Sequence, residues 1–331
     1  MRKICAALLA AGVMLWAGLP TNAQKKNTNT DKVAAYVNGQ PIMETALTRA
    51  LRRIPADKHD KFRPELLHFL IDNLLIEQHL TRLGIQADPK EVAEKLEKVK
   101  EEIKKGGSTY EKVLKELLLT EAELKQQIAA ELQWEKYVDS QANDAVLRKL
   151  FNANRDVFNG SMVRARHILL TPKKEDAKSD EAEKARLLKL KAQIEAEVAK
   201  GLAKLPPGTD KLEREKQRAK LMEDAFAAVA AKESQCPSKS RGGELGFFPR
   251  AGAMVEPFAS AAFALKPYEL SDVVTTQFGH HLILVTERRP GKDITFEEAK
   301  PGVLDYFADQ LRVSLIEQLR PKAKIVINDP K

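Results

Sequence analysis

The sequence predicts an α+β fold in two parts: a helical domain built from both ends of the chain, and a middle domain with a small antiparallel sheet flanked by helices. Apolar residues recur at helical spacing over 44–158, whereas 162–171 and 282–286 are short β-prone runs. A last helix over 295–319 carries an apolar stripe that needs a partner. The N-terminal helices are the expected partner, which makes the helical domain discontinuous.

Residues 1–23 are typical of an export signal. A short basic start precedes an apolar stretch, 4–19, that is too short for a membrane span, and small residues ending at Ala23 suit cleavage there. A retained N-terminal anchor is the alternative. Cys5 lies before the apolar stretch, which argues against a lipoprotein. We therefore expect an exported, periplasmic protein rather than one at the outer face of a Gram-positive membrane.

Composition limits the stability mechanism and the partners. The 331-residue chain has a formal net charge of +8 and two cysteines, and loss of 1–23 leaves Cys236 alone, without an internal disulfide. Buried apolar surface must then stabilise the fold, and a chain of this length can supply it. Basic and acidic residues alternate along stretches such as 90–105, as on solvated helices, and no aromatic-basic cluster supports nucleic-acid binding.

Turn and capping signals divide the N-terminal part. The β-prone run 33–37 ends at the turn signal Asn38-Gly39. Asp88 is a predicted N-cap, and Ser108 and Thr120 each begin a predicted capping box. This part holds several amphipathic helices and no candidate catalytic group.

Two histidines of the middle domain are predicted to point into apolar surfaces. With the two-residue period of a strand, His167 shares a face with Val163 and Ala165, and His281 shares one with Ile283. A single such histidine is more often a core residue than a catalytic one. Two on neighbouring strands, close to the lone cysteine of the mature chain, favour a functional site.

The cysteine lies in an unusual loop. Cys236 is a candidate site residue because it precedes Pro237 within a polar, glycine-rich segment, 234–248, which does not suit inert burial. Nearby apolar residues have the character of a cup that could bind a small ring. We call this set the apolar cup: Leu245, Phe248, Met254 and Phe258.

Five motifs follow one another in the middle domain. They are Arg-His-Ile-Leu at 166–169, Cys-Pro-Ser at 236–238, Gly-Gly-Glu-Leu-Gly-Phe-Phe at 242–248, Met-Val-Glu-Pro-Phe at 254–258 and Phe-Gly-His-His at 278–281. In this order the segment resembles the parvulin family of peptidyl-prolyl cis/trans isomerases.

The resemblance implies a role for each matching residue. His167 and His281 would be the paired active-site histidines, Cys236 takes the place of an active-site cysteine that is aspartate in some members, and Thr276 would form hydrogen bonds near the histidines. Leu245, Met254 and Phe258 would bind the proline, and Phe248 would line the rim of the cup. The family requires no metal and no cofactor.

The wider layout is similar to exported SurA/PrsA-type foldases. It implies a chaperone domain over 24–160, a parvulin-like domain over 161–290, and a C-terminal helix and strand over 291–331 that return to the chaperone domain. Segment 202–223 departs from the family as an insertion, interpreted as solvated. The implied partners are unfolded or proline-containing secreted clients, and the layout leaves a dimer open.

Three functions are weighed. The favoured one is a peptidyl-prolyl cis/trans isomerase and chaperone that assists the folding of exported or outer-membrane proteins. A non-catalytic holdase whose parvulin-like domain only binds peptide is the alternative, and the presence of all four implied active-site residues argues against it. A thiol protease is the third, and no Asn or Asp is evident in the sequence to orient a histidine.

Overall fold

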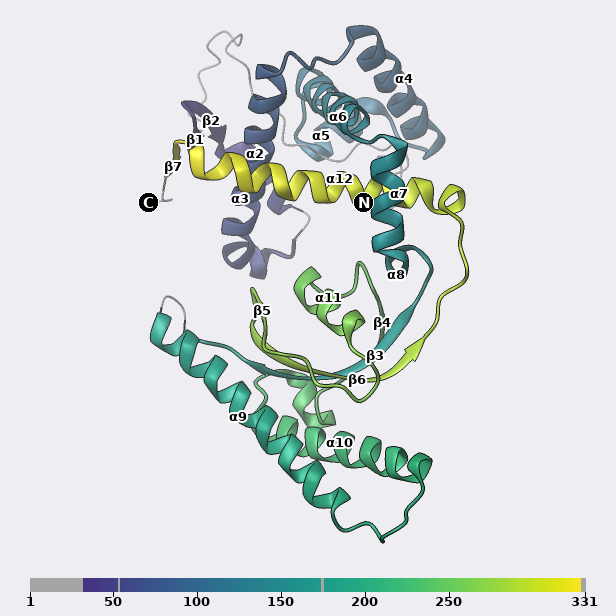
Figure 1. The fold of residues 1–331 in the computed structure, drawn as a ribbon. Helices are drawn as coiled ribbons and strands as arrows, with labels where there is room; N and C mark the ends of the chain where they lie inside the picture. The colour runs from purple at the N-terminus through teal and green to yellow at the C-terminus, as the bar shows by residue number, and fades with distance from the viewer. Residues whose placement is uncertain (1–31, 53, 174–175, 329–331) are drawn as a thin grey trace. The chain divides into compact units, whose positions relative to one another are not determined.

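The computed structural model describes residues 32–52, 54–173 and 176–328 (Figure 1). The predicted signal peptide, 1–23, lies outside these residues. The chain divides into two compact units: a first unit of Met1–Leu147 with Leu304–Lys331, and a second unit of Arg148–Val303. Each contains a small antiparallel sheet and several helices, so the α+β prediction is confirmed. Among the described helices, none has the length and apolar character that crossing a membrane requires.

A three-stranded sheet in the first unit brings the two ends of the described chain together. β1 (Val33–Val37) pairs antiparallel with β2 (Gln40–Met43) through the predicted Asn38-Gly39 turn, in which both residues have positive φ. β7 (Ile325–Ile327) pairs with the other edge of β1. The C-terminal strand therefore completes the sheet that the N-terminal hairpin begins.

Further helices of the described chain belong to the first unit. They are α2 (Glu44–Leu51), η1 (Ala56–Lys58), α3 (His59–Arg82), α4 (Pro89–Lys105), α5 (Tyr110–Leu117), α6 (Glu121–Gln141) and η3 (Arg320–Lys322). Leu315, from α12 (Phe296–Leu319), is buried against Ile76 and Leu80 of α3. The apolar C-terminal stripe thus finds its partner among the N-terminal helices of the first unit.

Two of the three predicted helix starts are confirmed, and the third lies one residue further along the chain. Asp88 accepts a hydrogen bond from the Lys90 backbone N–H at the start of α4. Thr120 and Glu123 form a complete capping box at the start of α6. The prediction that Ser108 begins a capping box is wrong, because Thr109 caps α5 and accepts from the backbone of the third helical residue.

A four-stranded antiparallel sheet organises the second unit in the order β4-β3-β6-β5. Its strands are β3 (Met162–Leu170), β4 (Glu244–Pro249), β5 (Val274–Thr276) and β6 (Gly279–Arg289). The other helices are α7 (Asp144–Ala153), α8 (Arg155–Phe158), α9 (Ala177–Leu202), α10 (Lys211–Glu233), η2 (Pro237–Arg241) and α11 (Glu256–Ala264). The two long helices α9 and α10 lie on one face of this sheet and α11 on the other (Figure 1).

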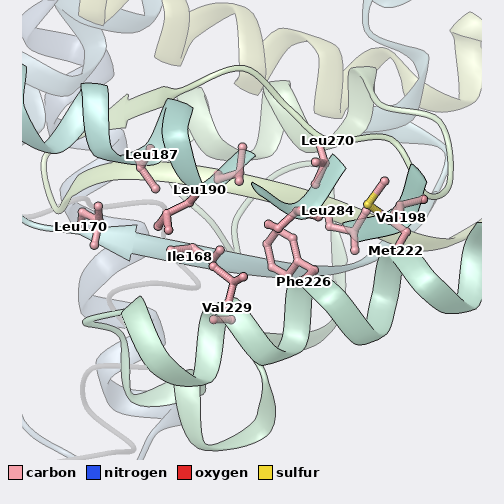
Figure 2. Close-up of a cluster of buried hydrophobic side chains, with 13 residues drawn as sticks. Ile168, Leu170, Leu187, Leu190, Val198, Met222, Phe226, Val229, Leu270 and Leu284 are labelled. Carbon is pink, nitrogen blue, oxygen red and sulfur yellow. The ribbon is translucent and has the colours of Figure 1, made fainter. Parts of the chain in front are cut away.

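Alternation along β3 and β6 divides their apolar residues between the two faces. Ile168 and Leu284 pack with the side chains of α9 and α10, and the ring of Phe226 from α10 lies among them (Figure 2). Ala165 and Ile283, on the other face, pack against α11. Because the side-chain period of a strand is two, residues adjacent in sequence face different helices.

We expect Phe226→Ala to destabilise the second unit by about 3–5 kcal/mol, because the ring is fully buried and its removal leaves a cavity. Urea unfolding measures the change. Leu212→Ala on the same helix is the control, since that side chain is 66% exposed and should change stability by no more than about 0.5 kcal/mol. Equal effects of the two substitutions would contradict the observed packing.

Candidate active site

The two predicted histidines lie side by side on the face that carries α11. His167 pairs with Ile283 and Leu169 pairs with His281, so the histidines are diagonal neighbours on β3 and β6. Their Nδ1 atoms are 3.2 Å apart and the planes of their rings differ by 18°. The side chains are buried, with 6% and 4% of their surface exposed. The prediction that both point into an apolar face is confirmed.

Thr276 extends the pair into a hydrogen-bonded row. Its Oγ1 lies 2.8 Å from Nε2 of His281 and accepts a hydrogen bond of 3.1 Å from the Phe278 backbone N–H. At the other end of the row, Nε2 of His167 is buried without a partner among the described residues. We call Thr276, His281 and His167 the histidine row. It ends in one unsatisfied nitrogen, a feature that needs a ligand or a functional explanation.

Proton positions along the row are coupled. A hydrogen bond between two neutral imidazoles places a single proton between their Nδ1 atoms. If His281 donates this proton, its Nε2 accepts from Thr276 and Nε2 of His167 carries a hydrogen. If His167 donates instead, every bond in the row reverses and Nε2 of His167 becomes an acceptor. The unpartnered Nε2 of His167 can therefore act as donor or acceptor while both rings stay neutral.

Both rings are neutral at pH 7. Burial lowers the pKa of His167 from 6.5 to about 4. The pKa of His281 is also lowered to about 4, first by burial and then by the charges of His167 and His280. An imidazolium in this pocket would have lost most of its hydration with no carboxylate to replace it.

Phe258 forms the wall beside both histidines. Its ring centroid lies 5.6 Å from that of His167 and 5.2 Å from that of His281, in edge-to-face geometry. Leu245 and Met254 are half-buried and pack in the same cluster. Phe248 is only 2% exposed and packs on Phe258, so it supports the apolar cup from beneath. The expectation that Phe248 lines the rim is wrong, because its position on β4 turns the ring into the core.

Two glycines allow the site's loops to approach β3 closely. Gly243 has φ +79°, and a Cβ atom there would lie 2.3 Å from the His167 carbonyl oxygen. Gly279, with φ +128°, would place a Cβ 2.4 Å from the Leu170 carbonyl oxygen. Any side chain at either position would push the cysteine loop or the β5–β6 hairpin away from the histidines.

Cys236 lies near the site but outside the histidine row. The loop before it is attached to β3, because the Gln235 backbone N–H donates to the Leu169 carbonyl at 2.8 Å and the Leu169 N–H donates to Ser234 Oγ at 3.1 Å. Cys236 is half-buried, and its thiol makes no hydrogen bond among the described residues. No group of three or more His, Cys, Asp or Glu in the described chain could hold a metal ion.

Sequence reasoning missed a second histidine network on the opposite sheet face. His280 is 1% exposed, with Nδ1 at 2.9 Å from Thr275 Oγ1 and Nε2 at 2.8 Å from Asp180 Oδ1. The expectation that no Asp orients a histidine is therefore wrong for His280. The doublets Thr275-Thr276 and His280-His281 could have revealed the second pair, but Asp180 is 100 residues away in the sequence and gives no local signal.

Two family models match the chain. The PPIC-type PPIASE domain matches residues 208–287, which include Cys236, Thr276 and His281, and the SurA-like N-terminal domain matches residues 1–138. The fold and the site thus define a class, the parvulin-type isomerases. The chain combines a PPIC-type parvulin isomerase domain with a SurA-like N-terminal domain. The predicted family and enzyme class are confirmed.

The chain is also similar to several individual proteins. The chain is 26% identical over 319 residues to "Parvulin-like PPIase" of Rickettsia bellii, covering 91% of this chain and 89% of that protein. It is 38% identical over 123 residues to "Foldase protein PrsA" of Bacillus subtilis, covering 36% of this chain and 42% of that protein. A crystal structure of the peptidylprolyl isomerase PrsA from Bacillus anthracis is 23% identical, with a TM-score of 0.44, over 80% of this chain and 100% of that one.

The low pKa values predict that acid destabilises the second unit. Unfolded histidines bind protons near pH 6.5, whereas His167 and His281 resist protonation until about pH 4. The unfolded state therefore binds more protons in this window, and the free energy of unfolding falls as pH drops from 6.5 towards 4. Urea unfolding should show a smaller loss for the double variant His167→Gln/His281→Gln. NMR titration of the folded protein with both midpoints near 6.5 would contradict the prediction.

Proposed function

We propose that His167, His281, Thr276 and Cys236 form the catalytic site for isomerisation of X-Pro bonds in exported client proteins. The observation that carries this proposal is the histidine row, which ends at an unpartnered Nε2 beside an apolar cup. A proline ring fits such a cup, and the free nitrogen would lie beside the polar amide that the ring carries.

The chemistry requires no covalent step. Amide resonance gives the C–N bond a rotation barrier of about 18–20 kcal/mol, and twisting removes that resonance. Binding the ring in Leu245, Met254 and Phe258 removes water from the amide, which favours the less polar twisted state. As the bond twists, the prolyl nitrogen gains a lone pair that Nε2–H of His167 could bind, so the hydrogen bond is stronger in the transition state than in the ground state.

The reversibility of the row supports this role. Nε2 of His167 can present a hydrogen to the twisted nitrogen without a charge appearing on either ring, because Thr276 and His281 adjust their protons in the same direction. Cys236 would contribute the polar edge of the site through its half-buried thiol. Substrate contact is thereby assigned to His167, and His281 and Thr276 set its tautomer.

We further propose that the first unit binds unfolded segments of the same clients. It has a groove of about 760 Å³ whose apolar lining includes Leu75, Tyr137, Leu315 and Leu319. The proposed functional bounds are 24–160 with 291–331 for the chaperone part and 161–290 for the isomerase part. The signal-like residues 1–23 and the SurA-like match support a periplasmic location.

A protease-coupled assay on a short proline peptide tests the catalytic proposal. We expect the mature protein to accelerate isomerisation and His281→Ala to lower kcat/KM by roughly 100-fold, because the donor nitrogen of His167 loses the partner that sets its tautomer. Cys236→Ala then measures the contribution of the thiol. His68→Ala, an exposed histidine of the first unit, is the control and should retain full activity.

The same assay separates the isomerase from the holdase. A wild-type protein that suppresses aggregation of an unfolded client yet leaves the proline peptide at its uncatalysed rate would be a holdase whose second unit only binds peptide. Loss of catalysis in His281→Ala with aggregation suppression intact would assign the two activities to different units.

Met254→Ala tests the apolar cup. The half-buried side chain is proposed to contact the proline ring in both ground and transition states, so its truncation should raise KM several-fold and leave kcat within about twofold. Leu188→Ala on α9, where the side chain is 54% exposed, should leave both parameters unchanged. An unchanged KM in Met254→Ala would remove this residue from the cup.

A further inference from the structure

The β5–β6 hairpin, which brings Thr276 to His281, has few backbone hydrogen bonds to hold it because β5 is short. β5 is three residues long and lies at the edge of the sheet, joined to β6 through the turn at Phe278. Such short edge strands open easily unless other contacts hold them. The Thr276–His281 hydrogen bond therefore depends on what fixes β5 against β6.

Side-chain hydrogen bonds between the two strands occur on both faces. Thr276 meets His281 on the face of α11, and Thr275 meets His280 on the face of α9 at 2.9 Å. The register makes this double arrangement necessary, because Thr275 pairs directly with His280. The two bonds hold the same three-residue strand from opposite sides.

A hydrogen bond connects the Thr275–His280 pair to α9. Asp180, in the first turn of α9, lies 2.8 Å from Nε2 of His280 through Oδ1 and 2.7 Å from Lys184 Nζ through Oδ2. A carboxylate bonded to one ring nitrogen fixes the tautomer and the orientation of a histidine, as in catalytic triads and metal sites. Both ring nitrogens of His280 are thus satisfied, unlike those of His167.

We propose that His280 is a positioning residue for the active-site histidines: with Asp180 and Thr275 it holds the β5–β6 hairpin in the geometry in which Thr276 reaches His281. This inference rests on the proposed function for its effect on catalysis. It makes the start of α9 part of the support of the site, on the sheet face that the substrate does not contact.

Filling the core does not by itself explain a histidine at position 280. The next residues of β6 on the same face, Leu282 and Leu284, are fully buried and apolar. An apolar residue at 280 would fill the space without desolvating two polar nitrogens. What histidine adds is a directional connection from Asp180 to Thr275, which an apolar side chain cannot provide.

The test uses the full mature chain with four variants. His280→Phe removes both hydrogen bonds at similar volume, Asp180→Ala removes the orienting acceptor, and Asp180→Asn keeps an acceptor oxygen as the conservative rescue. Asp272→Ala is the matched control: it breaks another tie from α9 to the residues before β5, the 3.0 Å pair with Lys191, at a side chain that is 98% exposed. Urea unfolding confirms that each variant is folded.

Two readouts are measured: the ring ¹⁵N chemical shifts of His281, which report its tautomer, and kcat and KM. We expect His280→Phe and Asp180→Ala to change the His281 shifts towards a tautomer mixture. They should also lower kcat by roughly tenfold with KM little changed, as for loss of one positioning hydrogen bond. Asp180→Asn and Asp272→Ala should resemble the wild type.

The outcomes separate this inference from the proposed function. Unchanged His281 shifts in a folded His280→Phe protein would overturn the positioning role, and reduced stability with unchanged shifts and kcat would assign His280 to the core alone. If the wild type proves inactive, the proposed function fails, yet the shifts still decide whether His280 positions His281.

Discussion

The antiparallel pairing of β3 with β6 is the constraint on which the candidate site depends. Its register sets His167 and His281 diagonally on one face, so that their Nδ1 atoms meet, and sends Ile168 and Leu284 to the opposite face against α9 and α10. A shift of one residue would exchange the two faces and bury the histidines under the long helices. The apolar packing of the α9–α10 face therefore also fixes the geometry of the polar site on the other.

Burial removes water from the nitrogens of both histidines, and hydrogen bonds within the histidine row replace most of the lost interactions. Each ring would lose hydration at two nitrogens, but the histidine row satisfies three of the four, through Thr276 and the shared Nδ1–Nδ1 bond. The remaining nitrogen is Nε2 of His167, whose ring packs against Phe258. Nε2 of His167 is thus the one nitrogen of the row that has lost water without gaining a partner among the described residues, and a bound amide would supply that partner.

Local sequence patterns predicted most of this arrangement. They did not predict contacts between residues that are far apart in the sequence. The two-residue period correctly placed His167 and His281 on an apolar face, and the apolar stripe of α12 correctly required a partner. Phe248 was misplaced because the resemblance to the family assigns a residue to the cup without fixing how deep its ring lies. Asp180 was missed because only the folding of α9 across the sheet brings it to His280. A signal of that kind is absent from any short window of sequence.

The electrostatic state of the site distinguishes isomerisation from thiol chemistry. A nucleophilic cysteine needs a cationic neighbour or a hydrogen-bonded base to form its thiolate. Here the Cys236 thiol has no hydrogen bond to His167 or His281 among the described residues, and burial keeps both rings neutral with pKa values of about 4. The one histidine with a carboxylate partner, His280, lies on the opposite face. Rotation about a prolyl bond creates no full charge, so the neutral, buried histidine row beside the apolar cup suits this reaction. A thiolate carries a full negative charge, which the same neutral and buried surroundings would not stabilise.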